Sequence, residues 1–121
     1  MTLKDNFYKI KEIQYTHNSV IYTVRFNSDH FIYASHFPGN PITPGVCITQ
    51  IVKELAEELT QTSLFLKIVK NIKFIQIINP LLYPEVNFIL SNPKEDESGY
   101  KVTANVEYNG DIFAKMSLQF K

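Results

Sequence analysis

Apolar residues follow two different spacings along this chain, and the spacing changes near residue 43 and again near residue 64. Over residues 18–27, apolar positions alternate with more polar ones, which is the period of a strand with one buried face. The alternating apolar residues are Val20, Tyr22, Val24 and Phe26. We therefore predict strands over residues 7–15 and 18–27.

A helical spacing begins after residue 43. The apolar residues that this spacing places on one face are Ile48, Ile51, Val52, Leu55 and Leu59. Charged residues cover much of the remaining surface, as in a helix that packs against a core along one side. Thr43 can serve as the N-cap, and Pro44 suits the first helical position, where its missing N–H costs nothing. The preceding residues 31–42 contain two prolines and a glycine, so we expect them to be irregular.

The strand pattern returns after the helix. The expected strands cover residues 64–78, with a bend, and residues 85–91, 99–108 and 112–120. Asn109-Gly110 joins the last two and is a strong hairpin signal. One apolar-faced helix among five or six mostly antiparallel strands has to bury its stripe against the sheet. The pattern predicts one α+β domain over residues 1–121, with a curved antiparallel sheet wrapped around a single central helix.

The composition supports this prediction and excludes several functional classes. Hydrophobic residues make up 45% of the chain, and 12 basic residues balance 12 acidic ones. This balance leaves no electrostatic signature of nucleic-acid or membrane-surface binding. Cys47 is the only cysteine, which excludes an internal disulfide and a cysteine-based metal site. No apolar run reaches the roughly 18 residues of a membrane span, and the first residues lack a signal-peptide pattern, so we expect a cytoplasmic location.

Residues 36–50 carry the chemistry of the chain. A histidine, His36, lies in a loop interrupted by proline and glycine, and a second Pro-Gly pair opens the predicted helix. The first N–H groups of a helix are unpaired and attract developing negative charge. Gly45 has no side chain, so the carbonyl of a ligand can approach its N–H closely. An imidazole near such amides is suited to proton abstraction next to a carbonyl.

This segment resembles the active-site stretch of the hot-dog-fold 3-hydroxyacyl-[acyl-carrier-protein] dehydratases. The matching residues are His36, Phe37, Pro38, Gly39, Pro41, Pro44, Gly45 and Val46. The resemblance implies that His36 is the base, that the Ile42 carbonyl orients its ring, and that Gly45 and Val46 bind the thioester. It also implies a hot-dog fold and an acyl thioester on acyl carrier protein or coenzyme A. The resemblance further implies a homodimer or higher even oligomer with sites across the subunit interface. It implies no metal or redox cofactor.

The chain departs from this family at Gln50, where the family has a catalytic Glu or Asp. Glutamine has no titratable proton, and general acid catalysis typically contributes about 10²–10⁴-fold. Three compensations are open. His36 can return the abstracted proton to the leaving hydroxyl, Gln50 can polarise a water, or Glu54 can supply the acid from one helical turn away.

Two further functions stay open beside the dehydratase. One is acyl-thioester hydrolysis, which the same fold supports but which usually also needs a helix carboxylate. The other is a non-catalytic subunit that binds an acyl group or a carrier protein, with an active homologue as its partner. Retention of His36 favours an enzyme over this binding subunit.

Several residues also have an ordinary structural interpretation. His36 can be a loop residue with a structural backbone bond, and Gln50 an ordinary solvated or interface side chain. Cys47 is expected to be a small buried residue. His17 and His30 are expected at the surface. Three lysines between residues 67 and 73 fit a solvated sheet surface better than a docking patch for an acidic carrier: Lys67, Lys70 and Lys73.

Overall fold

The computed structural model describes residues 2–35 and 39–121. Its seven strands form one sheet in the order β1-β2-β4-β6-β7-β3, and the short β5 pairs with β6. The strands are β1 (Tyr8–Tyr15), β2 (Ser19–Phe26), β3 (Leu66–Phe74), β4 (Glu85–Ser91), β5 (Lys94–Asp96), β6 (Gly99–Tyr108) and β7 (Asp111–Phe120). The helices of the described residues are α1 (Phe31–Ser35) and α2 (Gly45–Thr60). None of them is long and apolar enough to cross a membrane.

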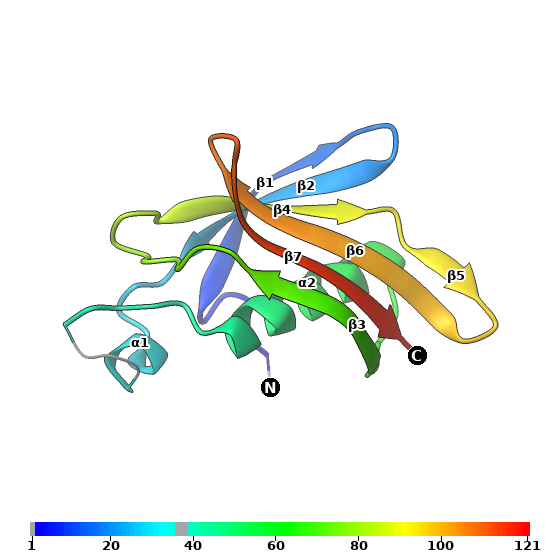
Figure 1. The fold of residues 1–121 in the computed structure, drawn as a ribbon, viewed down its shortest axis with the longest axis horizontal. Helices are drawn as coiled ribbons and strands as arrows, with labels where there is room; N and C mark the ends of the chain where they lie inside the picture. The colour runs from blue at the N-terminus through cyan, green and yellow to red at the C-terminus, as the bar shows by residue number, and fades with distance from the viewer. Residues whose placement is uncertain (1, 36–38) are drawn as a thin grey trace.

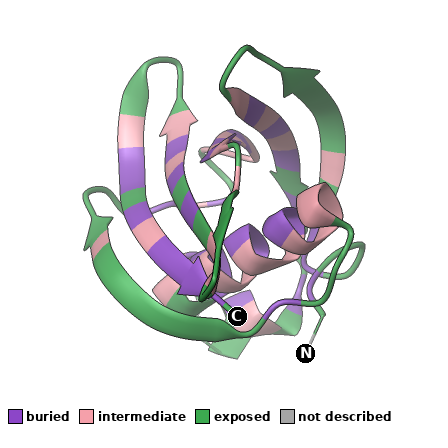
Figure 2. Ribbon diagram, turned by 90° about the vertical axis from the view of Figure 1, so that its right-hand side faces the viewer, coloured by how far each residue is buried: buried purple, intermediate pink, exposed green. Residues whose placement is uncertain are grey.

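The sheet curves around α2 without closing, and β1 and β3 form its two edges (Figures 1 and 2). Every strand pair in it is antiparallel. The predicted α+β hot-dog architecture is therefore confirmed. Along several strands around the helix, buried positions alternate with more exposed ones, as the banded colouring in Figure 2 shows.

The apolar face of α2 forms the centre of the core. Ile51, Val52 and Leu55 have no exposed surface, and Ile48 is 3% exposed. Burial of one such side chain stabilises the fold by about 1.5–3 kcal/mol, so this face holds the helix in one rotational setting. Leu59, at the end of the predicted stripe, is partly buried against the same core.

The register between strands pairs buried residues with buried residues. In the β2–β4 pair, three buried residues of one strand face three buried residues of the other, because side chains alternate between faces with a period of two. These buried pairs are Val20 with Leu90, Tyr22 with Phe88, and Val24 with Val86. The alternation read from residues 18–27 is therefore the inner face of the sheet.

The region before α2 differs from the prediction. Residues 31–35 form the short helix α1, since the prolines and the glycine that interrupt this region all come after Ser35. Thr43 is not the N-cap of α2. Pro44 occupies that position without a side-chain hydrogen bond, because the Thr43 hydroxyl is bonded to Tyr33.

The predicted strand over residues 64–78 is also too long. β3 ends at Phe74, because the N–H groups of Ile75 and Gln76 both donate to the carbonyl of Phe113 and turn the chain. β5 was not predicted, because its three residues are charged and exposed and have no alternating pattern.

His30 is buried, contrary to the prediction of a surface position. It is 7% exposed, its ring stacks on Phe31 and meets the ring of Phe7 edge-on, and its Nδ1 accepts a hydrogen bond from Ile32 N–H. The exposed position of His17 and the buried position of Cys47 agree with the prediction.

The Asn109-Gly110 hairpin is confirmed. Both residues have positive φ, 52° and 87°, as a two-residue hairpin turn between twisted strands requires. The N–H of Gly110 also donates to the Glu107 carboxylate at 3.0 Å.

Two glycines with positive φ give a matched test of backbone crowding. A Cβ at Gly99 would lie 2.1 Å from the carbonyl oxygen of Phe120, whereas a Cβ at Gly110 would meet nothing within 4 Å. We expect Gly99→Ala to lower the free energy of unfolding by at least about 3 kcal/mol and Gly110→Ala by about 1 kcal/mol. Urea unfolding measures both, and equal losses would contradict the role of the Phe120 contact.

Candidate functional site

The first turn of α2 presents two backbone amides without a protein acceptor. Among residues 2–35 and 39–121, nothing accepts a hydrogen bond from the N–H of Gly45 or Val46. The next two amides, of Cys47 and Ile48, donate to the carbonyl of Pro44 at 3.0 and 3.1 Å. Val46 is 73% exposed, so this end of the helix is open to a ligand. Its amides and the helix dipole favour an oxygen that carries negative charge.

An aromatic ring lies directly beside Gly45. A Cβ at this position would come within 2.7 Å of Cζ of Phe74, so the glycine leaves the space that the ring occupies. Phe74 is the last residue of β3 and is half-exposed. The amides of Gly45 and Val46 therefore have an apolar wall on one side, which suits an acyl chain more than a charged group.

A buried hydrogen bond ties α1 to the chain that enters α2. The hydroxyls of Tyr33 and Thr43 lie 2.9 Å apart, and the N–H of Thr43 donates to the carbonyl of Ile78 at 2.8 Å. Burial raises the pKa of Tyr33, so its hydroxyl stays protonated. Nothing in the sequence indicates this pair, because the residues are ten positions apart and neither belongs to a recognised motif.

Residues 36–38 lie outside the described part of the chain. The proposed base, His36, and its expected bond to the Ile42 carbonyl therefore stay predictions. Ile42 itself is half-buried, two residues before the Pro44 cap. The predicted substrate-binding residues Ile42, Gly45 and Val46 thus lie together around the first turn of α2, through their closeness in the sequence.

Gln50 lies on the flank of α2, and its amide donates to a carboxylate on the same helix. The Nε2 of Gln50 is 2.9 Å from Oε2 of Glu54. Three further donors reach the same carboxylate from the start of the chain: the N–H of Leu3 at 2.7 Å, the N–H of Lys4 at 2.8 Å and the Tyr8 hydroxyl at 3.1 Å. Glu54 is thus an acceptor for four donors.

This arrangement bears on the alternative in which Glu54 replaces the missing acid. Each carboxylate oxygen of Glu54 accepts two hydrogen bonds, which an ionised carboxylate satisfies fully. If Glu54 were protonated, its own O–H would be a hydrogen-bond donor, and it would face one of the groups that already donate to this carboxylate. The geometry therefore favours Glu54 as an anchor for the N-terminal segment over Glu54 as a proton donor.

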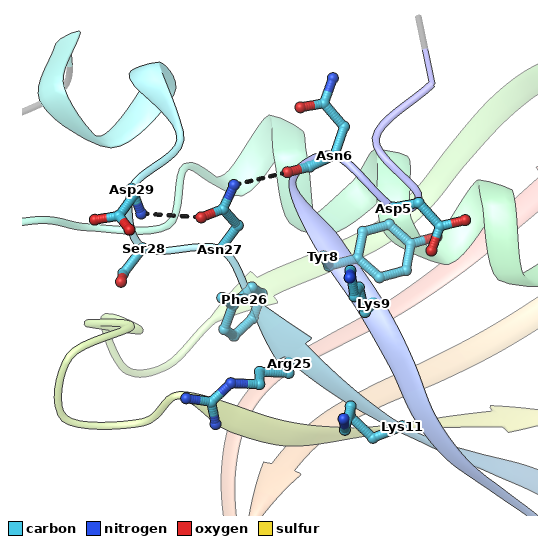
Figure 3. A pocket seen from close by; sticks show the side chains of 10 residues that line it. All are labelled: Asp5, Asn6, Tyr8, Lys9, Lys11, Arg25, Phe26, Asn27, Ser28 and Asp29. Carbon is cyan, nitrogen blue, oxygen red and sulfur yellow. Dashed lines mark hydrogen bonds between the residues drawn. The ribbon is translucent and has the colours of Figure 1, made fainter.

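A surface cavity of about 610 Å³ lies at the start of β1 and the end of β2 (Figure 3). Its lining is polar and of mixed charge, including Lys9, Lys11 and Asp29, and Arg25 pairs there with Glu85 at 3.3 Å. None of the residues predicted to bind substrate lines this cavity. Within the described ranges, no group of three or more His, Cys, Asp or Glu side chains could hold a metal ion.

The edge strand β3 exposes apolar side chains at one edge of the sheet. Its half-exposed apolar side chains are Leu66, Ile68, Val69 and Phe74. The three lysines in this region are exposed as well, and their part in carrier docking stays untested.

The fold is that of the hot-dog dehydratases, and comparison with known proteins defines the family. A family model described as ApeI-like, ApeI dehydratase, matches residues 12–114, so the chain belongs to the ApeI-like dehydratase family. The expected relation to a dehydratase family with a hot-dog fold is thereby confirmed. Its more specific form, the His-Phe-Pro-Gly type with glutamine in place of the acid, stays a prediction.

Two solved structures share this fold at low sequence identity. The dehydratase heterocomplex ApeI:P from Xenorhabdus doucetiae superimposes with a TM-score of 0.71 and 15% identity, over 92% of this chain and 95% of that one. An uncharacterised protein from Erwinia carotovora subsp. atroseptica gives a TM-score of 0.66 and 20% identity, over 91% and 90%. No curated protein matches the chain.

The Tyr33–Thr43 bond can be tested through stability. We expect Tyr33→Phe to lower the free energy of unfolding by about 1–2 kcal/mol, because it leaves the buried Thr43 hydroxyl without its partner. Tyr15→Phe is the control, since Tyr15 is 71% exposed, and should change little. Chemical denaturation measures both variants, and equal effects would mean that the buried bond contributes nothing specific.

Proposed function

We propose that this protein dehydrates 3-hydroxyacyl thioesters carried by acyl carrier protein or coenzyme A. One observation carries the proposal: two helix amides that have no acceptor among the described residues follow a His-Phe-Pro-Gly segment in a chain of the ApeI-like dehydratase family. In this proposal Gly45 and Val46 bind the thioester oxygen, His36 is the base, and Gln50 stands where related enzymes carry the acid.

The reaction needs one proton to leave carbon and one to reach oxygen. The imidazole of His36 removes the proton alpha to the thioester carbonyl, and the electron pair forms the double bond as the Cβ–O bond breaks. The departing hydroxyl takes the proton back from the imidazolium and leaves as water. Negative charge on the thioester oxygen is stabilised by the amides of Gly45 and Val46, and one such donor is worth roughly 3–4 kcal/mol.

A second subunit completes the site in this proposal. Described residues of one chain leave the amides of Gly45 and Val46 open, and the adjoining edge strand β3 exposes apolar side chains. An exposed edge strand is prone to pair with another strand. We therefore propose a cytoplasmic homodimer or higher even oligomer that pairs along β3.

The presence of glutamine at position 50, where related enzymes carry the acid, favours a second candidate function, that of a non-catalytic subunit. A chain without the acid can bind an acyl group or carrier protein while a homologous partner supplies the missing carboxylate. The similar structure from Xenorhabdus doucetiae is described as a dehydratase heterocomplex, which supports an assembly of unlike chains as an alternative to the homodimer.

Turnover assays separate these functions. Purified protein is incubated with 3-hydroxyacyl, enoyl and saturated acyl thioesters, and the products are identified by mass spectrometry. We expect interconversion of the hydroxyacyl and enoyl forms. Free acid would instead indicate hydrolysis, and binding without turnover would indicate the non-catalytic subunit.

The role of His36 is tested by His36→Ala, which we expect to abolish this interconversion because no other base is proposed. His17→Ala is the matched control, since His17 is exposed on the turn between β1 and β2, and should retain wild-type rates. Unchanged turnover by His36→Ala would refute the assignment of the base.

Gln50→Glu should increase dehydration by up to about 10²-fold. Its new carboxyl supplies the titratable proton that the amide lacks, so it can protonate the leaving hydroxyl. The gain should shrink toward high pH, where the new carboxyl ionises. Initial rates between pH 5 and 9 measure it, with Gln14→Glu on exposed β1 as control. A lower rate at every pH would show that the amide itself is required.

A further inference from the structure

Two cationic side chains face each other on the outer side of the first two strands. Tyr8 and Phe26 are partners in the antiparallel pair of β1 and β2, and both are buried. The adjacent residues of these strands, Lys9 and Arg25, are also partners, and they face away from the core because side chains alternate between the two faces. Like charges directly opposite each other destabilise a sheet. The pair of Lys9 and Arg25 therefore costs free energy unless an anion lies between them.

A β-bulge brings a third cation to the same place. The pairing of β1 with β2 shifts between Ile10 and Glu12, so Lys11 is the extra residue and has no partner on β2. A bulge changes the direction of a side chain, and Lys11 lines the same cavity as Lys9 and Arg25 (Figure 3). Three cations thus border one cavity of about 610 Å³.

The protein itself neutralises little of this charge. Among residues 2–35 and 39–121, Arg25 has one ion pair, from Nη1 to Glu85 at 3.3 Å, and no carboxylate forms an ion pair with Lys9 or Lys11. Lysines on an edge strand can serve to prevent pairing with another chain. Arg25 lies on the interior strand β2, so that role does not account for the cation opposite Lys9.

The segment that follows β2 adds a carboxylate to the cavity. Nδ2 of Asn27 donates to the carbonyl of Asn6 at 3.0 Å, and the N–H of Asp29 donates to Oδ1 of Asn27 at 3.1 Å, as Figure 3 shows. These bonds fix the segment against the residues before β1. The Asp29 side chain lines the cavity, and no described cation pairs with it. The cavity therefore offers cations to one part of a ligand and a hydrogen-bond acceptor to another.

We propose that this cavity binds a phosphate ester that also carries sugar hydroxyls, as a nucleotide does. A phosphate dianion matches the cations in charge, and the planar guanidinium of Arg25 donates two hydrogen bonds to it. Lys9 and Lys11 act as point charges on the same group. Asp29 accepts hydrogen bonds from the sugar hydroxyls. A volume of about 610 Å³ suits a ligand of this size and exceeds the need of a phosphate ion alone.

Two sources share this chemistry, a free nucleotide and the nucleotide part of coenzyme A. In a ¹⁵N NMR titration, adenosine monophosphate should shift the backbone amides of residues 5–11 and 25–29. Calorimetry should show that adenosine and inorganic phosphate each bind at least roughly tenfold more weakly, because each lacks one half of the ligand. Tighter binding of coenzyme A than of adenosine monophosphate would assign the site to coenzyme A, and weaker binding would assign it to a free nucleotide.

Variants that each remove one charge locate the site. Lys9→Gln and Arg25→Gln should each weaken the binding of adenosine monophosphate roughly tenfold. Lys101→Gln is the matched control, since Lys101 is exposed on β6 and does not line the cavity, and it should change the affinity little. Asp29→Asn should weaken the binding of adenosine monophosphate but not of inorganic phosphate, which has no sugar hydroxyls.

Stability provides a second measurement. Without ligand, Lys9→Gln should not lower the free energy of unfolding, since it removes a like charge opposite Arg25. Adenosine monophosphate should raise the midpoint of thermal unfolding more in the wild-type protein than in Lys9→Gln. Unshifted cavity amides at millimolar ligand, or equal weakening by Lys101→Gln, would overturn the proposal. None of these readouts requires turnover, so the outcome is independent of the proposed dehydration.

Discussion

Burial of one face of α2 is the constraint on which the rest of the structure depends. The sheet curves around this helix, and the residues that fill the contact, Ile51, Val52 and Leu55, are fully buried. Because that face has to point inward, the helix cannot rotate about its axis. At its start, the amides of Gly45 and Val46 have no acceptor among the described residues, and further along Gln50 and Glu54 are held at the margin of the core, half-buried. This hydrophobic contact thus places the groups that α2 contributes to the candidate site.

The carboxylate of Glu54 connects this helix to the start of the chain. Hydrogen bonds to a charged group contribute about 1.5–3 kcal/mol each, so the three donors from residues 3–8 make a strong link. The same hydrogen bonds favour Glu54 as an anchor for this segment. A carboxylate on the helix of a candidate site is therefore not by itself evidence of an acid catalyst. Its donors decide whether it serves the reaction or the fold.

The relation to other members of the fold shows how little sequence the architecture requires. Two solved structures superimpose over about nine-tenths of the chain with only 15% and 20% identity. Residues that alternate in a strand or recur on a helix face can be exchanged for others of similar size and polarity without loss of the core. Chemistry at a site is more demanding, because it depends on individual atoms, as the proposed role of the Gly45 N–H illustrates. Family membership therefore supports the class of reaction and leaves the roles of individual residues, such as the one at position 50, to experiment.

The sequence by itself determined the elements whose signal is local. Alternation, helical spacing and the Asn109-Gly110 turn each act over a few residues, and they predict the helix stripe, the hairpin and the strands other than β5 and the end of β3. The short motif that begins at His36 likewise led to the right fold and a dehydratase family, and it drew attention to Gln50.

Tertiary structure decided whatever depends on a partner distant in the chain. Thr43 was expected to cap α2, but a tyrosine ten residues earlier takes its hydroxyl. His30 was expected at the surface, yet it is buried against Phe7. Glu54 could be seen beside Gln50 in the sequence, but three of its four donors come from residues 46 to 51 positions away. A hydrogen bond is directional and short, so the role of a polar residue depends on which donors and acceptors the folded chain brings within about 3 Å of it.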